Sequence, residues 1–386
     1  MKQINASSHR TPIYRDVGFP FNSLSDAEQA FIDEGQFPQS SPHSIYTRYG
    51  NPTVRATEEA LSDLEGSHWS MLTSSGMSAI DTALSAFQKG LQTGTWLFFS
   101  EIYGGTNIYI DEILRKTRGI QVERFTPQAD SFNLNEFIEI LERVKPDLLF
   151  FESISNPLLI VPDAREVIKL AKERGVRVIV DNTFGTPSLW RPLQDGADLV
   201  VHSATKYLAG HGNLTAGVVS GNDEALKKQA LKYRKLTGCI LSPDDAYRLG
   251  TQLITFEMRF QKHCENAMRI ATFLRQNEHV SNVLYPGLPS HPTYEQAVDL
   301  FGDKGFGAMV TFELKGGRPA CEAFVDAIHN DVPYVLTLGD AGSILLHIST
   351  VFGREKYPAE GMIRLSVGCE PYEKLEGSIS KGLKSI

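Results

Sequence analysis

The sequence predicts an α/β protein with a mostly parallel central sheet and a smaller α+β unit toward its carboxyl end. Short runs of nearly continuous apolar residues recur between residues 95 and 220, with segments of helical periodicity such as Ala164–Gly175 between them. Runs of this kind are typical of parallel strands that crossover helices cover on both faces. The predicted strands are residues 95–100, 121–125, 147–152, 176–181, 198–203 and 216–220.

The composition limits the classes of partner. The chain has 386 residues, 41% hydrophobic and 22% charged, which is enough for two or more packed units. Its formal net charge of -8 argues against nucleic acid and against an anionic membrane surface, because both attract a basic protein. We therefore expect a small-molecule partner, and no nucleic-acid or membrane partner.

The cysteines and the amino terminus bear on the cellular location of the protein. The four cysteines are scattered without C-x-x-C spacing, so neither a zinc site nor a disulfide framework is indicated, and we expect no metal. Residues 1–18 contain no apolar core of signal-peptide length, and no later segment has the apolar length of a membrane span. These features favour a reducing, cytoplasmic location.

The chain begins with an arm and continues into a large domain. Residues 1–55 are rich in Ser, Pro, Asn and aromatic residues, as in Phe37–Thr53, and show little periodicity. We expect them to form an extended arm. Residues 56–245 carry the predicted strands with their intervening helices, and we expect them to form one large domain.

A helix marks the boundary of a second domain. A long helical pattern begins after Leu241–Ala246, where Ser242 suits the N-cap position. Farther on, Gly307–Leu314 and Gly361–Gly368 have the composition of strands. We therefore place a smaller α+β domain at residues 246–386.

Polar side chains follow three of the predicted strands. Asn156 comes shortly after the run that ends at residue 152, Asp181 ends the next strand and leads to Thr183, and Ser203 ends another with Lys206 three residues later. In an open α/β sheet, ligands bind outside the carboxyl ends of the strands. An acid, an amide, hydroxyls and a lysine are thus expected at one edge of the sheet.

Lys206 is the most informative of these residues. Taken singly, a lysine is usually a solvated surface charge, a strand-terminal aspartate such as Asp181 is usually a cap, and Asn156 before a proline usually starts a turn. Lys206, however, follows a buried strand and lies in the small, hydroxyl-rich sequence "SATKYLAG". A partly desolvated lysine has a lowered pKa and can act as a nucleophile for Schiff-base formation.

A second motif suggests a phosphate site. The stretch "LTSSGMSAI" (residues 72–80) is a Ser/Gly turn directly before a helical pattern. Gly76 lets the backbone approach a ligand, and the free amides of a helix terminus favour a phosphate, although an ordinary N-cap would have the same sequence. Ser203 and Thr205 could donate hydroxyls to the same phosphate. A phosphate site, an aldehyde-capturing lysine and an acid together suggest pyridoxal 5'-phosphate (PLP).

Seven motifs then indicate a family. The chain resembles the Cys/Met-metabolism family of PLP-dependent enzymes, which includes cystathionine γ-synthases, cystathionine γ-lyases, methionine γ-lyases and homocysteine synthases. The resemblance covers almost the whole chain and implies the PLP-dependent transferase fold, which is aspartate aminotransferase-like and of fold type I. The motifs are, in order, "YTRYGNPT", "SSGMSA", "YGGT", "ESISNP", "VDNTF", "SATKYLAGHGN" and "IRLSVGCE".

The resemblance also implies roles for individual residues. Lys206 would form the Schiff base with PLP, Asp181 would pair with the pyridinium nitrogen, and Tyr103 would stack on the ring and act as an acid or base. Because the family's sites span subunits, a homotetramer built from catalytic dimers is implied. The further cofactor contacts would be the Gly76 and Met77 amides, Thr183, the Ser203 and Thr205 hydroxyls, and Tyr46 and Arg48 from a neighbouring subunit. The substrate carboxylate would be bound by Arg364 with Ser343 and Asn156.

The implied reaction is a γ-replacement or γ-elimination on a homoserine-derived amino acid, such as an O-acylhomoserine. It would pass through a quinonoid and a β,γ-unsaturated intermediate. A conventional cystathionine γ-synthase or cystathionine γ-lyase is the alternative. A nicotinamide-binding protein is a remote one, because no G-x-G-x-x-G follows the first strand. A non-catalytic binding protein would have no need of Lys206.

Departures from the family pattern concern the substrate. Ile45 and Gly342 stand where members that handle cystathionine often have acidic residues, and Gly105 stands where methionine γ-lyases have a cysteine. Asn213 replaces a common aspartate, and Leu345–Tyr357 replaces the family's late Thr-His segment. We therefore expect an unusual pocket for the second substrate.

Overall fold

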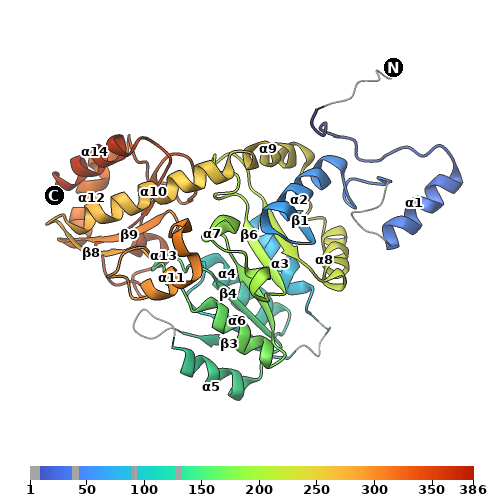
Figure 1. Ribbon diagram of the computed structural model, residues 1–386, viewed down its shortest axis with the longest axis horizontal. Coiled ribbons are helices and arrows are strands. Elements are labelled where there is room, and N and C mark those ends of the chain that lie inside the picture. Colours follow the sequence, from blue (N-terminus) through green and yellow to red (C-terminus); the bar gives the residue numbers. More distant parts are fainter. Residues whose placement is uncertain (1–8, 37–42, 89, 91–93, 127–132) are drawn as a thin grey trace.

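The large domain is built on a seven-stranded sheet. The computed structural model describes residues 9–36, 43–88, 90, 94–126 and 133–386 (Figure 1). The strand order across this sheet is β1-β7-β6-β5-β4-β2-β3. The strands are β1 (Trp69–Thr73), β2 (Trp96–Phe99), β3 (Val122–Phe125), β4 (Leu148–Glu152), β5 (Arg177–Asp181), β6 (Leu199–Ser203) and β7 (Gly217–Gly221).

The predicted α/β fold is confirmed, and every predicted strand of the large domain is present. β3, β2, β4, β5 and β6 are parallel, whereas β7 is antiparallel to both of its neighbours. The sequence did not predict β1, because its apolar run is interrupted by Ser70. That hydroxyl is paired across the sheet with Ser220 at 2.7 Å. β1 thus runs in the direction of the parallel strands, and its carboxyl end lies at the same edge as theirs.

Helices cover this sheet and build one core with it (Figure 1). α3 packs on β6 and β7, and α6 packs on β5. Aromatic side chains fill the part near β2 and β4, where the Phe99 ring lies 5.3 Å from Phe151 and 5.8 Å from Phe137. The helical elements are α2 (Pro52–Glu65), α3 (Gly76–Ser85), α4 (Gly104–Tyr109), the π-helix Ile110–Thr117, α5 (Leu134–Val144), α6 (Ala164–Glu173), α7 (Thr186–Leu189), the 3-10 turn Pro192–Asp195 and α8 (Glu224–Thr237).

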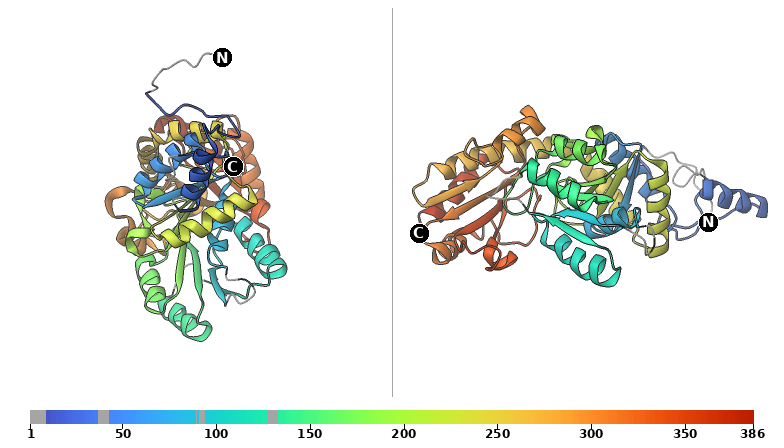
Figure 2. Two further views of the ribbon diagram at one scale, coloured as in Figure 1. Left: turned by 90° about the vertical axis from the view of Figure 1, so that its right-hand side faces the viewer. Right: turned by 90° about the horizontal axis from the view of Figure 1, so that it is seen from below.

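A second, antiparallel sheet of four strands lies in the C-terminal part, in the order β10-β11-β9-β8. It has its own hydrophobic core, and Figure 2 shows it at the end of the molecule opposite the amino-terminal arm. The strands predicted at 307–314 and 361–368 are confirmed as β9 and β11. The elements are α9 (Pro243–Leu253), α10 (Phe256–Arg275), β8 (Val280–Leu284), α11 (Tyr294–Phe301), the 3-10 turn Gly302–Lys304, β9 (Met309–Leu314), α12 (Gly317–Ile328), β10 (Ile344–His347), α13 (Ile348–Phe352), β11 (Met362–Ser366) and α14 (Tyr372–Leu383).

The helix expected near the domain boundary begins as predicted. α9 starts at Pro243, and the Ser242 side chain caps it by accepting the backbone N–H of Asp245. The helical pattern that follows is divided at residues 254–255, where α9 ends and α10 begins. The exact domain limits at 55 and 245 stay predictions.

The amino-terminal arm contains a helix, which the sequence did not predict. α1 (Leu24–Gln36) projects away from the body of the molecule (Figures 1 and 2). Ser23 explains its start, because this hydroxyl accepts the backbone N–H of Asp26 at 3.0 Å. Leu24 and Phe31 are 91% and 56% exposed. Residues 1–8 and 37–42 of the predicted arm lie outside the described residues.

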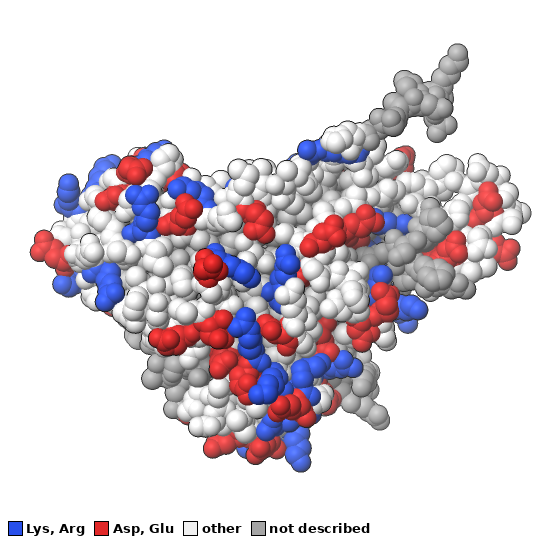
Figure 3. Space-filling model, viewed as in Figure 1, with Lys and Arg blue, Asp and Glu red and all other residues white. Residues whose placement is uncertain are grey.

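The surface carries charges of both signs. On the face shown in Figure 3, Lys and Arg side chains are interspersed with Asp and Glu. Within the described ranges, no helix combines the length and apolar character needed to cross a membrane.

Gly217 sets a close approach between β7 and the start of α3. It pairs with Thr73 on one side and with Ser203 on the other. A Cβ atom built at Gly217 would overlap the Ser75 carbonyl, at 2.6 Å from its carbon atom. Because these obstacles are backbone atoms, a larger side chain would have to displace the turn before α3.

We expect Gly217→Ala to lower the free energy of unfolding by about 1–3 kcal/mol, because the extra methyl has no space in a packed sheet. Gly377→Ala is the matched control. Gly377 lies within α14 with open space at its Cβ position, so alanine there should stabilise by about 0.5–1 kcal/mol. Urea unfolding of the two variants checks the difference, and equal effects would contradict it.

Candidate active site

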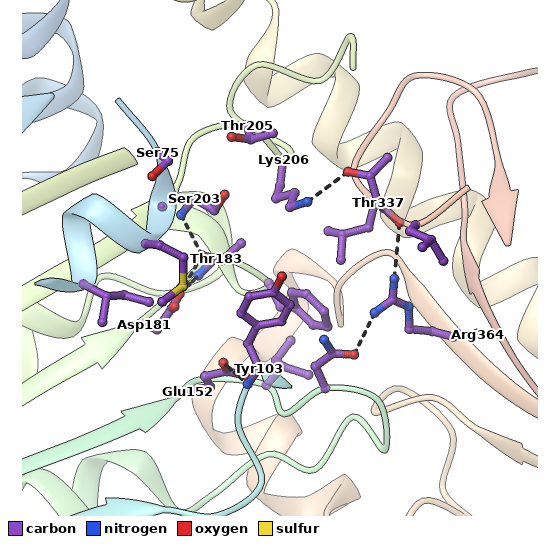
Figure 4. Close-up of a pocket in the computed structure, with 18 of the residues that line it drawn as sticks. Ser75, Tyr103, Glu152, Asp181, Thr183, Ser203, Thr205, Lys206, Thr337 and Arg364 are labelled. Carbon is purple, nitrogen blue, oxygen red and sulfur yellow. Dashed lines mark hydrogen bonds between the residues drawn. The ribbon is translucent and has the colours of Figure 1, made fainter. Parts of the chain in front are cut away.

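The carboxyl ends of the strands border a cavity of about 430 Å³. Residues after β1, β4, β5 and β6 line one side, and residues of the C-terminal part, including β11, line the other. Figure 4 shows Asp181 and Arg364 on opposite sides of the view, with the Tyr103 ring between them. The predicted site residues that line this cavity are Gly76, Met77, Tyr103, Asn156, Asp181, Thr183, Ser203, Thr205, Lys206 and Arg364.

Lys206 reaches the cavity from a turn after β6. Its backbone N–H donates to the Ser203 carbonyl at 3.1 Å, and its own carbonyl accepts the N–H of Gly210 at 2.7 Å. Gly210 has a φ of 67°, a conformation that favours glycine. The Lys206 ammonium nitrogen, Nζ, donates to Thr337 Oγ1 at 2.9 Å. Burial, with a smaller effect of the Arg364 charge, lowers the pKa of Lys206 to about 8.

Asp181 ends β5 with a buried carboxyl group. Its Oδ1 accepts the backbone N–H of Thr183 at 3.0 Å and the Thr183 hydroxyl at 2.6 Å. The same hydroxyl oxygen accepts the backbone N–H of Ser203 at 2.8 Å, so Thr183 joins the ends of β5 and β6. Burial raises the pKa of Asp181, and the Thr183 hydrogen bonds oppose that shift.

The amino terminus of α3 lies against Ser203. A Cβ atom built at Gly76 would lie 2.7 Å from Ser203 Cβ, so only a glycine permits this approach. Ser75, the N-cap, accepts the backbone N–H of Ser78 at 3.1 Å. The first amides of a helix have no partner within it, and those of Gly76 and Met77 belong to residues that line the cavity. This end of the cavity is suited to an anion.

Tyr103 projects its ring into the cavity (Figure 4). Its backbone N–H donates to Glu152 Oε1 at 2.6 Å, which fixes the chain just before α4. Glu152 lies beside Asp181 in the register of β4 and β5. Burial, together with the Asp181 charge, raises the pKa of Glu152 well above its usual range. The Tyr103 ring lies over Gly105, where a Cβ atom would lie 2.5 Å from Tyr103 Cε1, so the missing side chain leaves room for the ring.

Arg364 brings a buried guanidinium from β11 to the far side of the cavity. Nη1 donates to Asn156 Oδ1 at 2.7 Å and Nη2 donates to the Thr337 carbonyl at 3.2 Å, while Nε is buried without a partner. No carboxylate of the described residues forms an ion pair with it. Burial lowers the pKa of Arg364 to about 10. A buried guanidinium without an acid is suited to a bound carboxylate.

Three of the predicted site residues do not line this cavity. Ser343 does not line it: the Ser343 hydroxyl accepts the backbone N–H of Gly368 at 2.8 Å, because the residue precedes β10 and faces the end of β11. Tyr46 forms an isolated bridge with Gly18. Arg48 donates to the Lys235 carbonyl at 2.7 Å.

The structure adds residues that sequence reasoning missed. Thr337 binds both Lys206 and Arg364, but it lies in an irregular segment without a motif of its own. Glu152 could have been found, because it is a carboxylate that ends a buried strand. Ile45 and Gly342, the positions used to judge the substrate, are not among the cavity residues of this chain.

Comparison with known proteins identifies the family. The model of the family described as "Cys/Met metabolism PLP-dependent enzyme" matches residues 1–384. The chain belongs to this family. The resemblance inferred from the seven motifs is thereby confirmed, and with it the dependence on PLP.

Relatives in this Cys/Met-metabolism family have different names. The L-methionine gamma-lyase of Porphyromonas gingivalis is 34% identical over 97% of this chain and 92% of its own length. The O-succinylhomoserine sulfhydrylase of Pseudomonas aeruginosa is 34% identical, over 99% and 94%. The structure of cystathionine gamma synthase from Xanthomonas oryzae pv. oryzae in complex with cystathionine has a TM-score of 0.85, 33% identity and coverage of 97% and 92%. The chain is thus a member of a PLP-dependent γ-synthase and γ-lyase family.

The pKa of Lys206 can be tested in the cofactor-free enzyme. Only the uncharged amine reacts with acetic anhydride, so the acetylation rate of Lys206, followed by mass spectrometry, should rise with a midpoint at about pH 8. Arg364→Met removes a cation that lowers this pKa, so the midpoint should move upward toward the ordinary 10.5. Arg364→Lys keeps the charge and should leave the midpoint near the wild-type value. A wild-type midpoint at the ordinary value would contradict the burial of the amine.

Proposed function

We propose that the protein holds PLP through Lys206 and catalyses a γ-replacement or γ-elimination on an activated homoserine, such as an O-acylhomoserine. One arrangement carries the proposal: an amine, a carboxyl and an unpaired guanidinium, from Lys206, Asp181 and Arg364, line the same cavity. PLP chemistry on an amino acid needs an amine for the cofactor aldehyde, an acid for its ring nitrogen and a cation for the substrate carboxylate.

The cavity residues fit the cofactor. Asp181, held in place by Thr183, would pair with the ring nitrogen, and the Tyr103 ring would stack on the ring of the cofactor. The phosphate would lie at the amino terminus of α3, where the Ser203 side chain packs closely on Gly76. The complete set of proposed cofactor contacts is Gly76, Met77, Tyr103, Asp181, Thr183, Ser203, Thr205 and Lys206.

The substrate carboxylate would bind to Arg364. Asn156 already accepts a hydrogen bond from this guanidinium and fixes its orientation. Thr337, rather than Ser343, is the hydroxyl residue beside Arg364, and we assign it to the substrate side of the cavity. The free Nε of Arg364 leaves a donor for the ligand.

The protein groups would then move protons. Bound PLP supplies an electron sink that stabilises negative charge at the substrate Cα. Lys206 is suited to take up the Cα proton, because its lowered pKa increases the uncharged fraction of its amine near neutral pH. Thr337 Oγ1 holds that amine through a hydrogen bond. Tyr103 or Lys206 would donate a proton to the departing γ-substituent.

The names of the relatives support chemistry at the γ-carbon, because one is a γ-lyase of methionine and another is named for O-succinylhomoserine. At about one-third identity, they do not select the substrate. The alternative, a conventional cystathionine γ-synthase or γ-lyase, has support from the similar structure that contains cystathionine.

Purified protein should be yellow, and borohydride should bleach it and attach the reduced cofactor to the Lys206 peptide. Lys206→Ala should abolish turnover, because it removes the amine for both the cofactor and the proton transfer. Lys228→Ala is the control, because that lysine is exposed on α8. Mass spectrometry and visible absorbance check the attachment. Attachment to another lysine, or turnover by Lys206→Ala, would disprove the assignment.

The rate at which 2-oxobutyrate forms from different substrates tests the substrate class. Holoenzyme is mixed separately with O-acetylhomoserine, O-succinylhomoserine, cystathionine and methionine. We expect a homoserine ester to be consumed fastest. A clear preference for cystathionine would favour the alternative, and 2-oxobutyrate from none of them would contradict an elimination at the γ-carbon.

We further propose a homotetramer of catalytic dimers in which Tyr46 and Arg48 complete the phosphate site of a neighbouring subunit. Neither residue lines the cavity of its own chain, which supports this. An oligomer of only Arg48→Ala subunits, or of only Lys206→Ala subunits, should be inactive. Mixed oligomers should recover part of the activity, because some of their sites combine the intact Lys206 of one subunit with the intact Arg48 of the other. Sedimentation measures the oligomer, and no recovery on mixing would refute a shared site.

A further inference from the structure

Each charged side chain that lines the cavity already has a hydrogen-bond partner or a role in the proposed function. Within the described residues, those that line it are Glu152, Asp181, Lys206 and Arg364. Glu152 accepts the Tyr103 backbone N–H, and the proposed function uses the other three for the cofactor and for the α-carboxylate. Arg48 of a neighbouring subunit is proposed to bind the cofactor phosphate, so the lining from this chain leaves no charged partner for the far end of a substrate.

The remaining wall beside Arg364 is apolar. It comprises Leu336, Leu346, Val351 and Phe352. The last two belong to α13, and we call these four residues the α13 wall. The Phe352 ring centroid lies 5.8 Å from the Arg364 guanidinium carbon. We expect the γ-substituent of a substrate whose carboxylate is held by Arg364 to extend along this wall.

The position of α13 is fixed on both sides. His347 precedes it, and its Nδ1 lies 2.7 Å from Thr350 Oγ1 while its Nε2 lies 2.8 Å from the Glu360 carbonyl. The Tyr357 ring packs edge-on against Phe352 with centroids 6.0 Å apart. Leu346, Ile348, Tyr357 and Met362 form a small core below the helix. The α13 part of the wall is therefore held by packing.

Cations near α13 are paired with acids. Arg354 lies 3.1 Å from a Glu360 oxygen, and Lys356 lies 3.4 Å from a Glu101 oxygen. A carboxylate at the end of a substrate would have to separate one of these pairs or remain unpaired against the apolar wall. An unpaired charge that loses part of its hydration against this wall is unfavourable.

We propose that the α13 wall selects substrates with an uncharged γ-substituent, such as an acetyl ester or an alkyl thioether, over those with an anionic or zwitterionic one. The inference rests on the proposed function and names the substrate class of the same site. It also adds Val351, Phe352 and Leu336 to the positions that bear on substrate choice. Gly342 does not line the cavity, whereas Ile45 precedes Tyr46, which we propose to reach the site of a neighbouring subunit.

Binding of unreactive amino acids tests the selection directly. L-norleucine and L-2-aminoadipate have side chains of equal length that end in a methyl and a carboxylate. Titrations of the holoenzyme, followed by the visible spectrum of the cofactor, should give a dissociation constant at least about tenfold lower for norleucine. Equal affinity, or tighter binding of aminoadipate, would overturn the proposal.

Matched variants test whether α13 makes the choice. Val351→Lys places a cation on the wall and should shift the ratio of the two dissociation constants toward aminoadipate by about tenfold or more, whereas Val351→Met, of similar length, should leave the ratio near the wild-type value. Leu336→Lys and Leu336→Met are a second pair for the case that Val351→Lys does not fold, because Leu336 is 68% exposed. An unchanged ratio in both lysine variants would contradict the role of the wall.

Turnover separates this proposal from the proposed function. O-acetylhomoserine should have a higher kcat/KM than O-succinylhomoserine, and the lysine variants should narrow the difference. A holoenzyme that prefers O-succinylhomoserine would refute the selection while leaving the γ-chemistry intact. A holoenzyme that binds norleucine but converts none of the substrates would instead refute the proposed function.

Discussion

The burial of charged groups without their usual counter-ions is the constraint on which this molecule depends. One cavity is lined by Lys206, Asp181 and Arg364. Burial lowers the pKa of the lysine and of the arginine and raises that of the aspartate, so that each shift favours the uncharged form. Such groups reduce the stability of the empty protein, and perturbed groups of this kind cluster at functional sites. In the proposed function, a cofactor and an amino-acid substrate would together offer the aldehyde, ring nitrogen and carboxylate that complement them.

The two sheets hold these groups in place from opposite sides. Parallel strands bring the ends of β4, β5 and β6 to one edge, and the Thr183 hydroxyl links two of those ends. Arg364 comes from the antiparallel sheet and is oriented by Asn156, which follows β4. The site therefore exists only where the two sheets meet, and packing in either core affects it.

The family chemistry and the substrate choice lie in different parts of the structure. The predicted cofactor contacts come mostly from strand ends of the large domain, whose motifs agree with the family. Three of the four residues of the proposed α13 wall, Leu346, Val351 and Phe352, lie within residues 345–357, the segment that we expected to depart from the family pattern. Relatives at about one-third identity carry names for different substrates.

The sequence by itself determined the fold class, and it predicted most of the candidate site. Buried parallel strands leave continuous apolar runs, and the polar residues that end them must meet at one edge, so Asp181, Ser203 and Lys206 could be grouped without coordinates. The same reasoning missed β1, where Ser70 breaks the run, and α1, whose cap at Ser23 lies in a polar segment. Only the tertiary structure decided that Thr337 rather than Ser343 lies beside Arg364. It also decided that α13, and not Gly342, borders the cavity, because these contacts join segments distant in sequence whose positions depend on the packing of the second sheet.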